Sequence, residues 1–98
     1  MVKREILKAT NQVKLTFIQP ANGSQTRVSV VGDFNSWNPK ANLLIKRSNN
    51  TASASVILPA GQRVRFRYVT GQGVWFNDEK ADAYEPGEHG EDNCLVII

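Results

Sequence analysis

The most constraining feature of this chain is a repeated two-residue alternation of apolar and polar side chains. It is clearest in residues 63–69, where Val64, Phe66 and Tyr68 alternate with three arginines. Successive side chains of a β-strand point to opposite faces of a sheet, so this alternation predicts a strand with one buried face. The same reasoning predicts strands at 13–18, 27–31, 43–46, 52–58, 73–76 and 93–98.

Turn-forming residues separate the predicted strands. Gly, Pro, Asn, Ser and Thr gather in the intervening stretches 20–24, 48–51, 59–61 and 70–73, and such residues favour turns. About seven short strands with frequent turns predict an all-β fold, an immunoglobulin-like antiparallel β-sandwich. We expect residues 13–98 to form this sandwich and residues 1–12 to form an N-terminal arm or an edge strand.

Composition excludes several classes of protein. A hydrophobic fraction of 41% is typical of a globular domain. No apolar run approaches the roughly 20 residues of a membrane-spanning helix, so we expect no membrane partner. Residues 1–8 are basic but lack the apolar stretch of a secretion signal, and the single cysteine, Cys94, has no partner for an internal disulfide. We therefore expect a cytoplasmic protein.

Charge is distributed unevenly along the chain. Residues 1–77 carry 11 Lys and Arg and two acids, whereas residues 78–98 carry one Lys and seven acids. A basic region can attract nucleic acid, and Arg63, Arg65 and Arg67 share one strand face. The basic residues are spread out, however, and solvated strand faces account for them equally well. Without a recognised motif, we do not expect a nucleic-acid partner.

The acidic segment raises the question of catalysis or metal binding. A glycosidase needs two carboxylates that flank the scissile bond, and Ca²⁺ needs several oxygen ligands. The acids here occupy one loop-rich segment without a scaffold for a cleft, and their spacing fits no EF-hand loop. We predict no catalytic residue, no metal site and no cofactor among them: Asp78, Glu79, Asp82, Glu85, Glu88, Glu91 and Asp92.

Two tryptophans lie in turn-rich segments. Trp37 is in the run Gly32-Asp33-Phe34-Asn35-Ser36-Trp37-Asn38-Pro39, and Trp75 follows the turn at 70–73. A large, flat, amphipathic ring on a loop suits a ligand with a flat apolar face, such as a sugar or a base. Alternatively, each indole closes one end of a small core.

The order of these motifs resembles that of a known family. Residues 30–39, VVGDFNSWNP, resemble the Gly-x-Phe-Asn-x-Trp signature of carbohydrate-binding module family 48. Its Pro-x-Gly turn and following strand, its Trp-x-x-Asp segment and its closing strand have counterparts at 59–61, 66–69, 75–78 and 90–97. The resemblance spans residues 13–98. It implies an early-set immunoglobulin-like fold and a non-catalytic domain that binds α-glucans such as glycogen, starch or maltooligosaccharides. Such domains accompany family 13 glycoside hydrolases and form part of the AMP-activated kinase beta subunit.

The resemblance also implies which residues bind sugar. Trp37 and Trp75 match the two stacking tryptophans, and Asn93 matches an amide that hydrogen-bonds glucose hydroxyls. Arg67 stands where those members usually have lysine. Further candidates near the matched motifs are Asn35, Asn77, His89 and Glu91. The implied partner is an α-glucan, together with a glucan-processing enzyme that the domain would serve.

Three positions depart from the kinase module. Glu91 replaces a threonine, and His89 replaces a leucine that threads the glucan. The hairpin at 70–74 is one residue longer, so the direction of Trp75 is left open. The alternative function is a protein-interaction or scaffold β-sandwich that has lost sugar binding, in which the two indoles would mark a partner surface.

Overall fold

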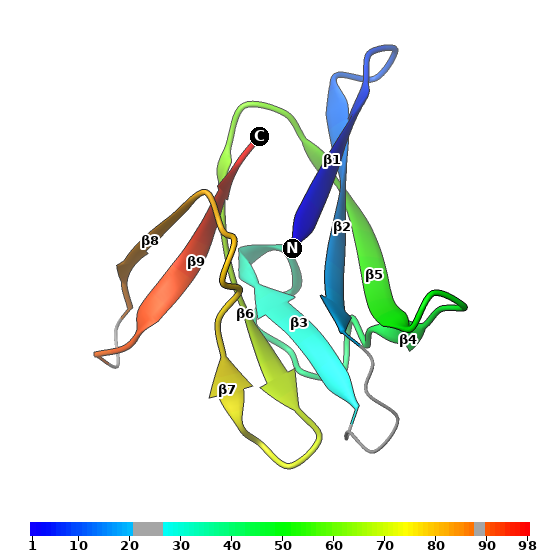
Figure 1. The fold of residues 1–98 in the computed structure, drawn as a ribbon. Helices are drawn as coiled ribbons and strands as arrows, with labels where there is room; N and C mark the ends of the chain where they lie inside the picture. Colours follow the sequence, from blue (N-terminus) through cyan, green and yellow to red (C-terminus); the bar gives the residue numbers. More distant parts are fainter. Residues whose placement is uncertain (21–26, 88–89) are drawn as a thin grey trace.

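Two antiparallel β-sheets packed face to face make up the structure, a computed structural model that describes residues 1–20, 27–87 and 90–98. Figure 1 shows the two layers side by side, with the first strand and the last strand in different sheets. The described residues contain no α-helix, only a 3₁₀ turn, η1 (Asp33–Asn35). The chain is therefore an all-β, immunoglobulin-like sandwich, as the alternating pattern predicts.

The first sheet has four strands in the order β1-β2-β5-β4. Its strands are β1 (Val2–Leu7), β2 (Gln12–Pro20), β5 (Thr51–Pro59) and β4 (Ile45–Lys46). β1 pairs along its whole length with β2 and lies at one edge of the sheet. The register of β2 against β5 places Leu15 opposite Val56 and Phe17 opposite Ala54, so these apolar side chains share the inner face.

The second sheet has five strands and is built around the long strand β6 (Arg63–Thr70). β3 (Val28–Gly32) pairs with the second half of one β6 edge. On the opposite edge, β9 (Asp92–Ile97) pairs with the first half of β6 and the two-residue β7 (Trp75–Phe76) with the second half. β8 (Ala83–Pro86) adds to β9. The junction between β7 and β9 therefore falls beside Arg67.

The core lies between the sheets and is dominated by aromatic and branched side chains. Phe17, Phe66 and Tyr68 are fully buried. Phe17 and Phe66 have ring centroids 5.0 Å apart, and Phe66 and Tyr68 meet edge to face at 5.8 Å; such pairs contribute about 0.5–1.5 kcal/mol beyond their burial. Phe66 and Tyr68, which sequence alternation assigns to one side of β6, thus form the centre of the fold together with Phe17 of β2.

One carboxylate, Asp78, is buried at the margin of this core. Its Oδ2 accepts hydrogen bonds from the Tyr68 hydroxyl at 2.8 Å and from the Met1 ammonium, and its Oδ1 accepts one from the Lys80 amide at 2.8 Å. Burial opposes its ionisation, but these hydrogen bonds outweigh burial and lower the pKa of Asp78. Burial also raises the pKa of the neighbouring Cys94 thiol, whose sulfur accepts from the Asp78 amide. We interpret this cluster as structural.

The part of the chain that the structure describes holds nine strands, whereas the sequence predicts about seven. All seven predicted segments contain strands. The additional ones are β1, which lies in the segment expected to be an arm or an edge strand, and β8. β8 escapes a pattern search because it holds only four residues, includes a glutamate and ends at a proline. Its pairing with β9, rather than its own alternation, makes it a strand.

Ion pairs join acids of the segment 78–98 to basic residues that are distant in the sequence, so opposite charges that are separated along the chain lie together in the fold. Asp82 pairs with Arg4, Glu85 with Arg65 and Glu91 with Arg67. The Arg4 contact ties the edge of the first sheet to the second, since Arg4 Nε also donates to the Ile97 carbonyl at 3.1 Å. These three acids of the segment 78–98 therefore form ion pairs within the fold.

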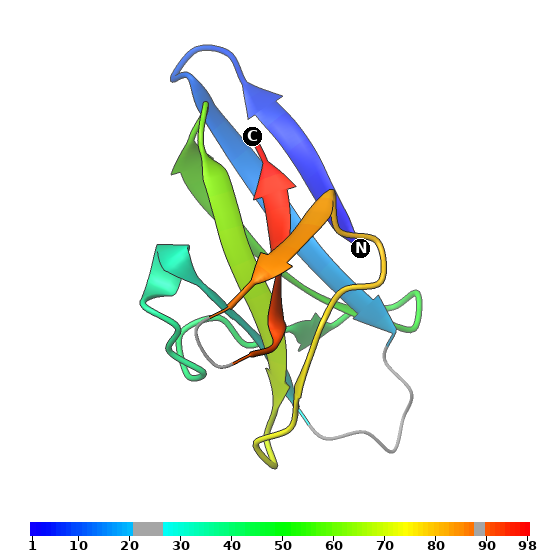
Figure 2. The same ribbon diagram turned by 90° about the vertical axis from the view of Figure 1, so that its left-hand side faces the viewer.

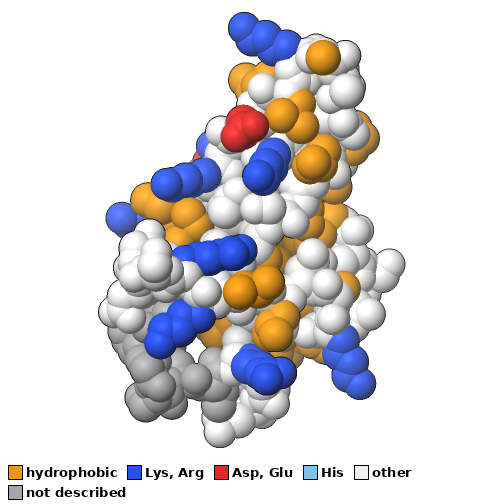
Figure 3. Space-filling view, turned by 90° about the vertical axis from the view of Figure 1, so that its right-hand side faces the viewer, with side chains coloured by type: hydrophobic (Ala, Val, Ile, Leu, Met, Phe, Trp, Pro, Cys, Tyr) orange, Lys and Arg blue, Asp and Glu red, His pale blue; other side chains and the backbone are white. Residues whose placement is uncertain are grey.

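Positive charge remains on the outer face of the first sheet. Register places Lys3 and Lys14 on this face, opposite in direction to the buried Val13. Figure 3 shows lysine and arginine side chains spread over it, with hydrophobic side chains and few acids between them. No helix in the described part of the chain has the length and apolar character that would allow it to cross a membrane.

Candidate functional site

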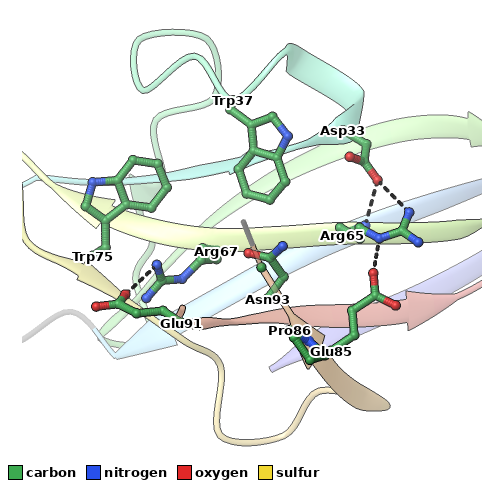
Figure 4. Close-up of a pocket in the computed structure, with 10 residues that line it drawn as sticks. Asp33, Trp37, Arg65, Arg67, Trp75, Glu85, Pro86, Glu91 and Asn93 are labelled. Atoms are coloured by element: carbon green, nitrogen blue, oxygen red, sulfur yellow. Dashed lines mark hydrogen bonds and ion pairs between the residues drawn. The ribbon is translucent and has the colours of Figure 1, made fainter. Parts of the chain in front are cut away.

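The outer face of the second sheet, which faces the viewer in Figure 2, carries a cavity of about 890 Å³. This volume is within the range of about 300–1,000 Å³ that small-molecule sites occupy. Four residues singled out from the sequence line it together: Trp37, Trp75, Arg67 and Asn93. Figure 4 shows the two indoles on one side of the cavity, above Arg67 and Asn93.

Trp75 faces outward because of its register with β6. It pairs with Val69, two residues beyond Arg67, while its neighbour Phe76 pairs with the buried Tyr68. Two residues along a strand point to the same face, so Trp75 and Arg67 lie on the outer face together. The indole is 42% exposed. The longer hairpin therefore leaves Trp75 open to ligand rather than turning it into the core.

Trp37 is presented by a strained turn after β3. Its φ is 58° and that of Ser36 is 55°, in the left-handed region that bulky residues rarely adopt. This conformation costs roughly 1–2 kcal/mol per residue. The Trp37 amide donates to the Gly32 carbonyl at 3.0 Å, which holds the turn in place. Backbone strain of this kind is concentrated at ligand sites.

Asn35 braces the same turn from within. Its Oδ1 accepts from the Gly32 amide at 3.0 Å, and its Nδ2 donates to the Val30 carbonyl at 3.0 Å and to Asn42 Oδ1 at 2.8 Å. It does not line the cavity. Of the sequence candidates, Asn35 is thus a residue that positions Trp37, with its amide already engaged.

Gly32 allows the turn to begin directly on the sheet. A Cβ at this position would lie 2.3 Å from the Arg65 carbonyl oxygen and 2.8 Å from the Phe34 ring, far closer than van der Waals contact. Only glycine therefore lets β3 approach β6 here while Phe34 packs against the core. The GDFNSW run therefore begins with glycine because there is no room for a side chain at position 32.

Arg67 connects the elements that surround the cavity floor. Its Nε donates to Asn77 Oδ1 at 2.7 Å, and its Nη1 pairs with Glu91 at 2.8 Å. Its guanidinium carbon lies 5.5 Å from the centre of the Trp75 ring, within cation–π range. The side chain is only 13% exposed. Arg67 therefore holds Trp75 in addition to facing the cavity.

Asn77 and Asn93 have different roles despite the same side chain. Asn77 accepts from Arg67 and donates to the Asp92 carbonyl at 2.8 Å, and it does not line the cavity. Asn93 is half-buried and lines the cavity beside Gly87, where a Cβ would come within 3.2 Å of its amide nitrogen. Its amide makes no hydrogen bond within residues 1–20, 27–87 and 90–98, so it can bind a ligand.

The remaining two candidates are on the β8–β9 turn. Glu91 lines the cavity and is 66% exposed while it pairs with Arg67. His89 lies outside the described residues. The structure thus places five of the eight sequence candidates around one cavity, whereas Asn35 and Asn77 do not line it and instead bond to Gly32 and Arg67.

The sequence does not identify a second charged group in the cavity. Arg65 lies between two carboxylates, with its Nε donating to Glu85 and its Nη1 at 3.5 Å from Asp33. The hydrogen bond that Arg65 donates to Glu85 is the main cause that raises the pKa of Arg65. Asp33 lies 32 residues before Arg65 in the chain and Glu85 lies 20 residues after it. A local sequence pattern cannot predict that residues so far apart form one group.

The charge of the cavity limits what it can bind. Its described lining has two arginines and three carboxylates, Asp33, Glu85 and Glu91. A polyanion such as nucleic acid needs an excess of positive charge, and this surface does not provide one. Within the described residues, no group of three or more His, Cys, Asp or Glu is arranged to hold a metal ion. The site suits a neutral ligand with apolar faces and many hydroxyls.

Comparison with known proteins places the chain beside a carbohydrate-related enzyme. It is 31% identical over 96 residues to an amylopullulanase of Thermoanaerobacter thermohydrosulfuricus. This similarity covers 94% of the chain but only 6% of that protein. No family model matches. The chain is therefore related to one small segment of a glycoside hydrolase.

Proposed function

We propose that this chain is a non-catalytic α-glucan-binding domain of the family 48 type. The observation that carries the proposal is the placement of Trp37 and Trp75 on one open face, with Arg67 and the amide of Asn93 beside them. A glucose ring has an apolar patch of C–H groups and a rim of hydroxyls. Indoles cover such patches, while amides and guanidinium groups bond to the rim.

The expected affinity follows from these contacts. Each stacked ring supplies about 1–3 kcal/mol, on the scale of aromatic stacking with bases. Each hydrogen bond from an exposed group adds about 0.5–1.5 kcal/mol, and ordering the ligand offsets much of the gain. A dissociation constant of about 10 µM to 1 mM results. Oligomers bind better than glucose because one sugar cannot cover both indoles.

The relationship to amylopullulanase supports the same ligand class, since that name denotes an enzyme of starch-type α-glucans and pullulan. The matched segment is 6% of that protein. We infer that the present domain likewise serves a glucan-processing enzyme, either within one chain or as a partner. Catalysis would then reside in the enzyme and not in this domain.

The experiment is a calorimetric titration with maltoheptaose. Wild type should bind saturably, whereas Trp75→Ala and Trp37→Ala should each weaken binding at least about 5-fold, the equivalent of 1 kcal/mol. The matched control is Ile57→Ala, because Ile57 is similarly exposed at 52% but lies in the other sheet. It should bind like wild type.

A folded wild-type protein that binds no maltoheptaose would contradict the proposal and favour the scaffold alternative. Migration in a native gel with embedded glycogen gives an independent reading. Retardation of wild type and Ile57→Ala, but not of Trp75→Ala, is the expected pattern.

A further inference from the structure

We propose that Asp33, Arg65 and Glu85 form a third subsite of the cavity, which binds a glucosyl unit beyond those that the two indoles cover. This inference rests on the proposed α-glucan binding and extends it toward chain length. The three residues line the same cavity as Trp37 and Trp75.

The subsite continues the line of the two indoles. Arg65 and Arg67 point to the same face of β6, and two residues along a strand span about 7 Å. Figure 4 shows Trp75, Trp37 and the Asp33–Arg65 pair in that order along the cavity. A glucan that crosses both indoles therefore arrives at Arg65 with its next unit.

The guanidinium of Arg65 is held rigidly for this task. Glu85 from β8 accepts from its Nε, and Asp33 from η1 lies 3.5 Å from its Nη1. Asp33 also accepts from the Arg65 backbone amide at 3.2 Å. A guanidinium has five N–H donors, and two of them face these carboxylates. The other donors keep a fixed direction, so a ligand that uses them loses little side-chain entropy.

Acceptors stand next to these donors. Across the described residues, Asp33 Oδ1 and Glu85 Oε2 accept no hydrogen bond, because the contacts to Arg65 use the other oxygen of each carboxylate. The side chains remain accessible, at 41% exposure for Arg65 and 28% for Glu85. A hydroxyl both donates and accepts. Neighbouring hydroxyls of a pyranose can therefore accept from Arg65 and donate to a carboxylate.

The balance of charge selects the ligand class. Two carboxylates surround one guanidinium, so an anionic unit such as a uronate or a sugar phosphate would face net repulsion. A neutral hexose unit would not. The subsite is thus suited to a further neutral glucosyl unit of a longer chain.

Calorimetry with maltotriose and maltoheptaose tests the subsite on wild type, Arg65→Gln and Glu85→Gln. We expect wild type to bind maltoheptaose more tightly than maltotriose. Each variant should lose about 3- to 10-fold in maltoheptaose affinity, the effect of one or two hydrogen bonds, while its maltotriose affinity stays unchanged. The control is Arg63→Gln, because Arg63 lies on the same face of β6 but outside the cavity, and it should match wild type for both ligands.

Three outcomes would overturn the inference. If both variants keep full maltoheptaose affinity, the third subsite does not contact the glucan. If they weaken the binding of both oligomers equally and lower the midpoint of thermal unfolding, Asp33, Arg65 and Glu85 only stabilise the fold near Trp37. If wild type binds neither oligomer, the proposed function itself fails. The first two results leave that function intact, so the two failures are distinguishable.

Discussion

Substitution of Arg67 by lysine separates two roles that this residue combines. Lysine keeps the positive charge at the cavity floor, but its ammonium is a point charge and lacks the planar, forked donors of a guanidinium. It cannot donate to Asn77 and Glu91 while remaining over the Trp75 ring, as Arg67 does. Arg67→Lys should therefore release Trp75 without removing the charge.

The magnitude follows from these contacts. A cation–π contact contributes about 0.5–2 kcal/mol, depending on its exposure, and the ion pair with Glu91, which is 66% exposed, contributes no more than about 1 kcal/mol. Misplacing Trp75 forfeits part of its stacking energy of about 1–3 kcal/mol. We expect maltoheptaose binding to weaken by about 1–2 kcal/mol, which is a 5- to 30-fold loss.

The assay combines titration calorimetry with the near-ultraviolet circular dichroism of the indoles. The dichroism should change in Arg67→Lys without ligand, because the surroundings of Trp75 change. Asn77→Ala is the companion variant, since it removes the acceptor for Arg67 Nε and leaves the cavity lining untouched. It should reproduce the spectral change and part of the affinity loss.

Retention of wild-type affinity and dichroism by Arg67→Lys would refute this reasoning, since charge alone would then suffice. An affinity loss with an unchanged spectrum would also refute it, because Arg67 would act only by direct contact with the sugar.

Three further predictions concern the other groups of the structure. Asn93→Ala should weaken maltoheptaose binding about 2- to 10-fold, one lost hydrogen bond, with an unchanged urea midpoint; a lowered midpoint would make Asn93 structural. Tyr68→Phe should lower the free energy of unfolding by about 1.5–3 kcal/mol because its acceptor is the buried Asp78 carboxylate. Tyr84→Phe should lower it by only about 0.5–1.5 kcal/mol, since its acceptor is the neutral backbone carbonyl of Asp78. Urea unfolding should rank the two variants in this order, and equal losses would contradict this reasoning. Folding lowers the pKa of Asp78 and of Asp82, the latter chiefly through the hydrogen bond from Arg4. Their contribution to stability is therefore complete above the unfolded-state pKa of about 4 and is lost as the pH falls through the folded-state values. Urea midpoints measured at about pH 7, 5 and 3 should fall only at the lowest pH, and they should fall less steeply in Asp82→Asn than in wild type.

The strands of the sandwich could be predicted because their alternation reflects a burial requirement that each strand meets locally. Val64, Phe66 and Tyr68 are all buried, as the pattern of 63–69 indicates. β8 could not be predicted in this way. Its Tyr84 faces the inner side opposite Cys94 but remains 45% exposed, so hydrogen bonding to β9, rather than a buried face, makes it a strand.

The candidate site shows where local reasoning ends. The direction of Trp75 depends on its register with Val69, which the hairpin length alone does not determine. Likewise, Asn35 and Asn93 are the same residue type, yet the Asn35 amide is hydrogen-bonded within a turn whereas Asn93 lines the cavity. The Arg65 cluster joins η1, β6 and β8, so only the folded sheet reveals it.

The most direct test of the central claim is a nuclear magnetic resonance titration that follows the two indole N–H signals with maltoheptaose. The chain has two tryptophans, so each signal reports on one ring platform. The shared site on the outer face predicts that both signals shift saturably, with one common dissociation constant. Movement of only one signal, or of neither while the protein remains folded, would contradict the claim that Trp37 and Trp75 bind one glucan together.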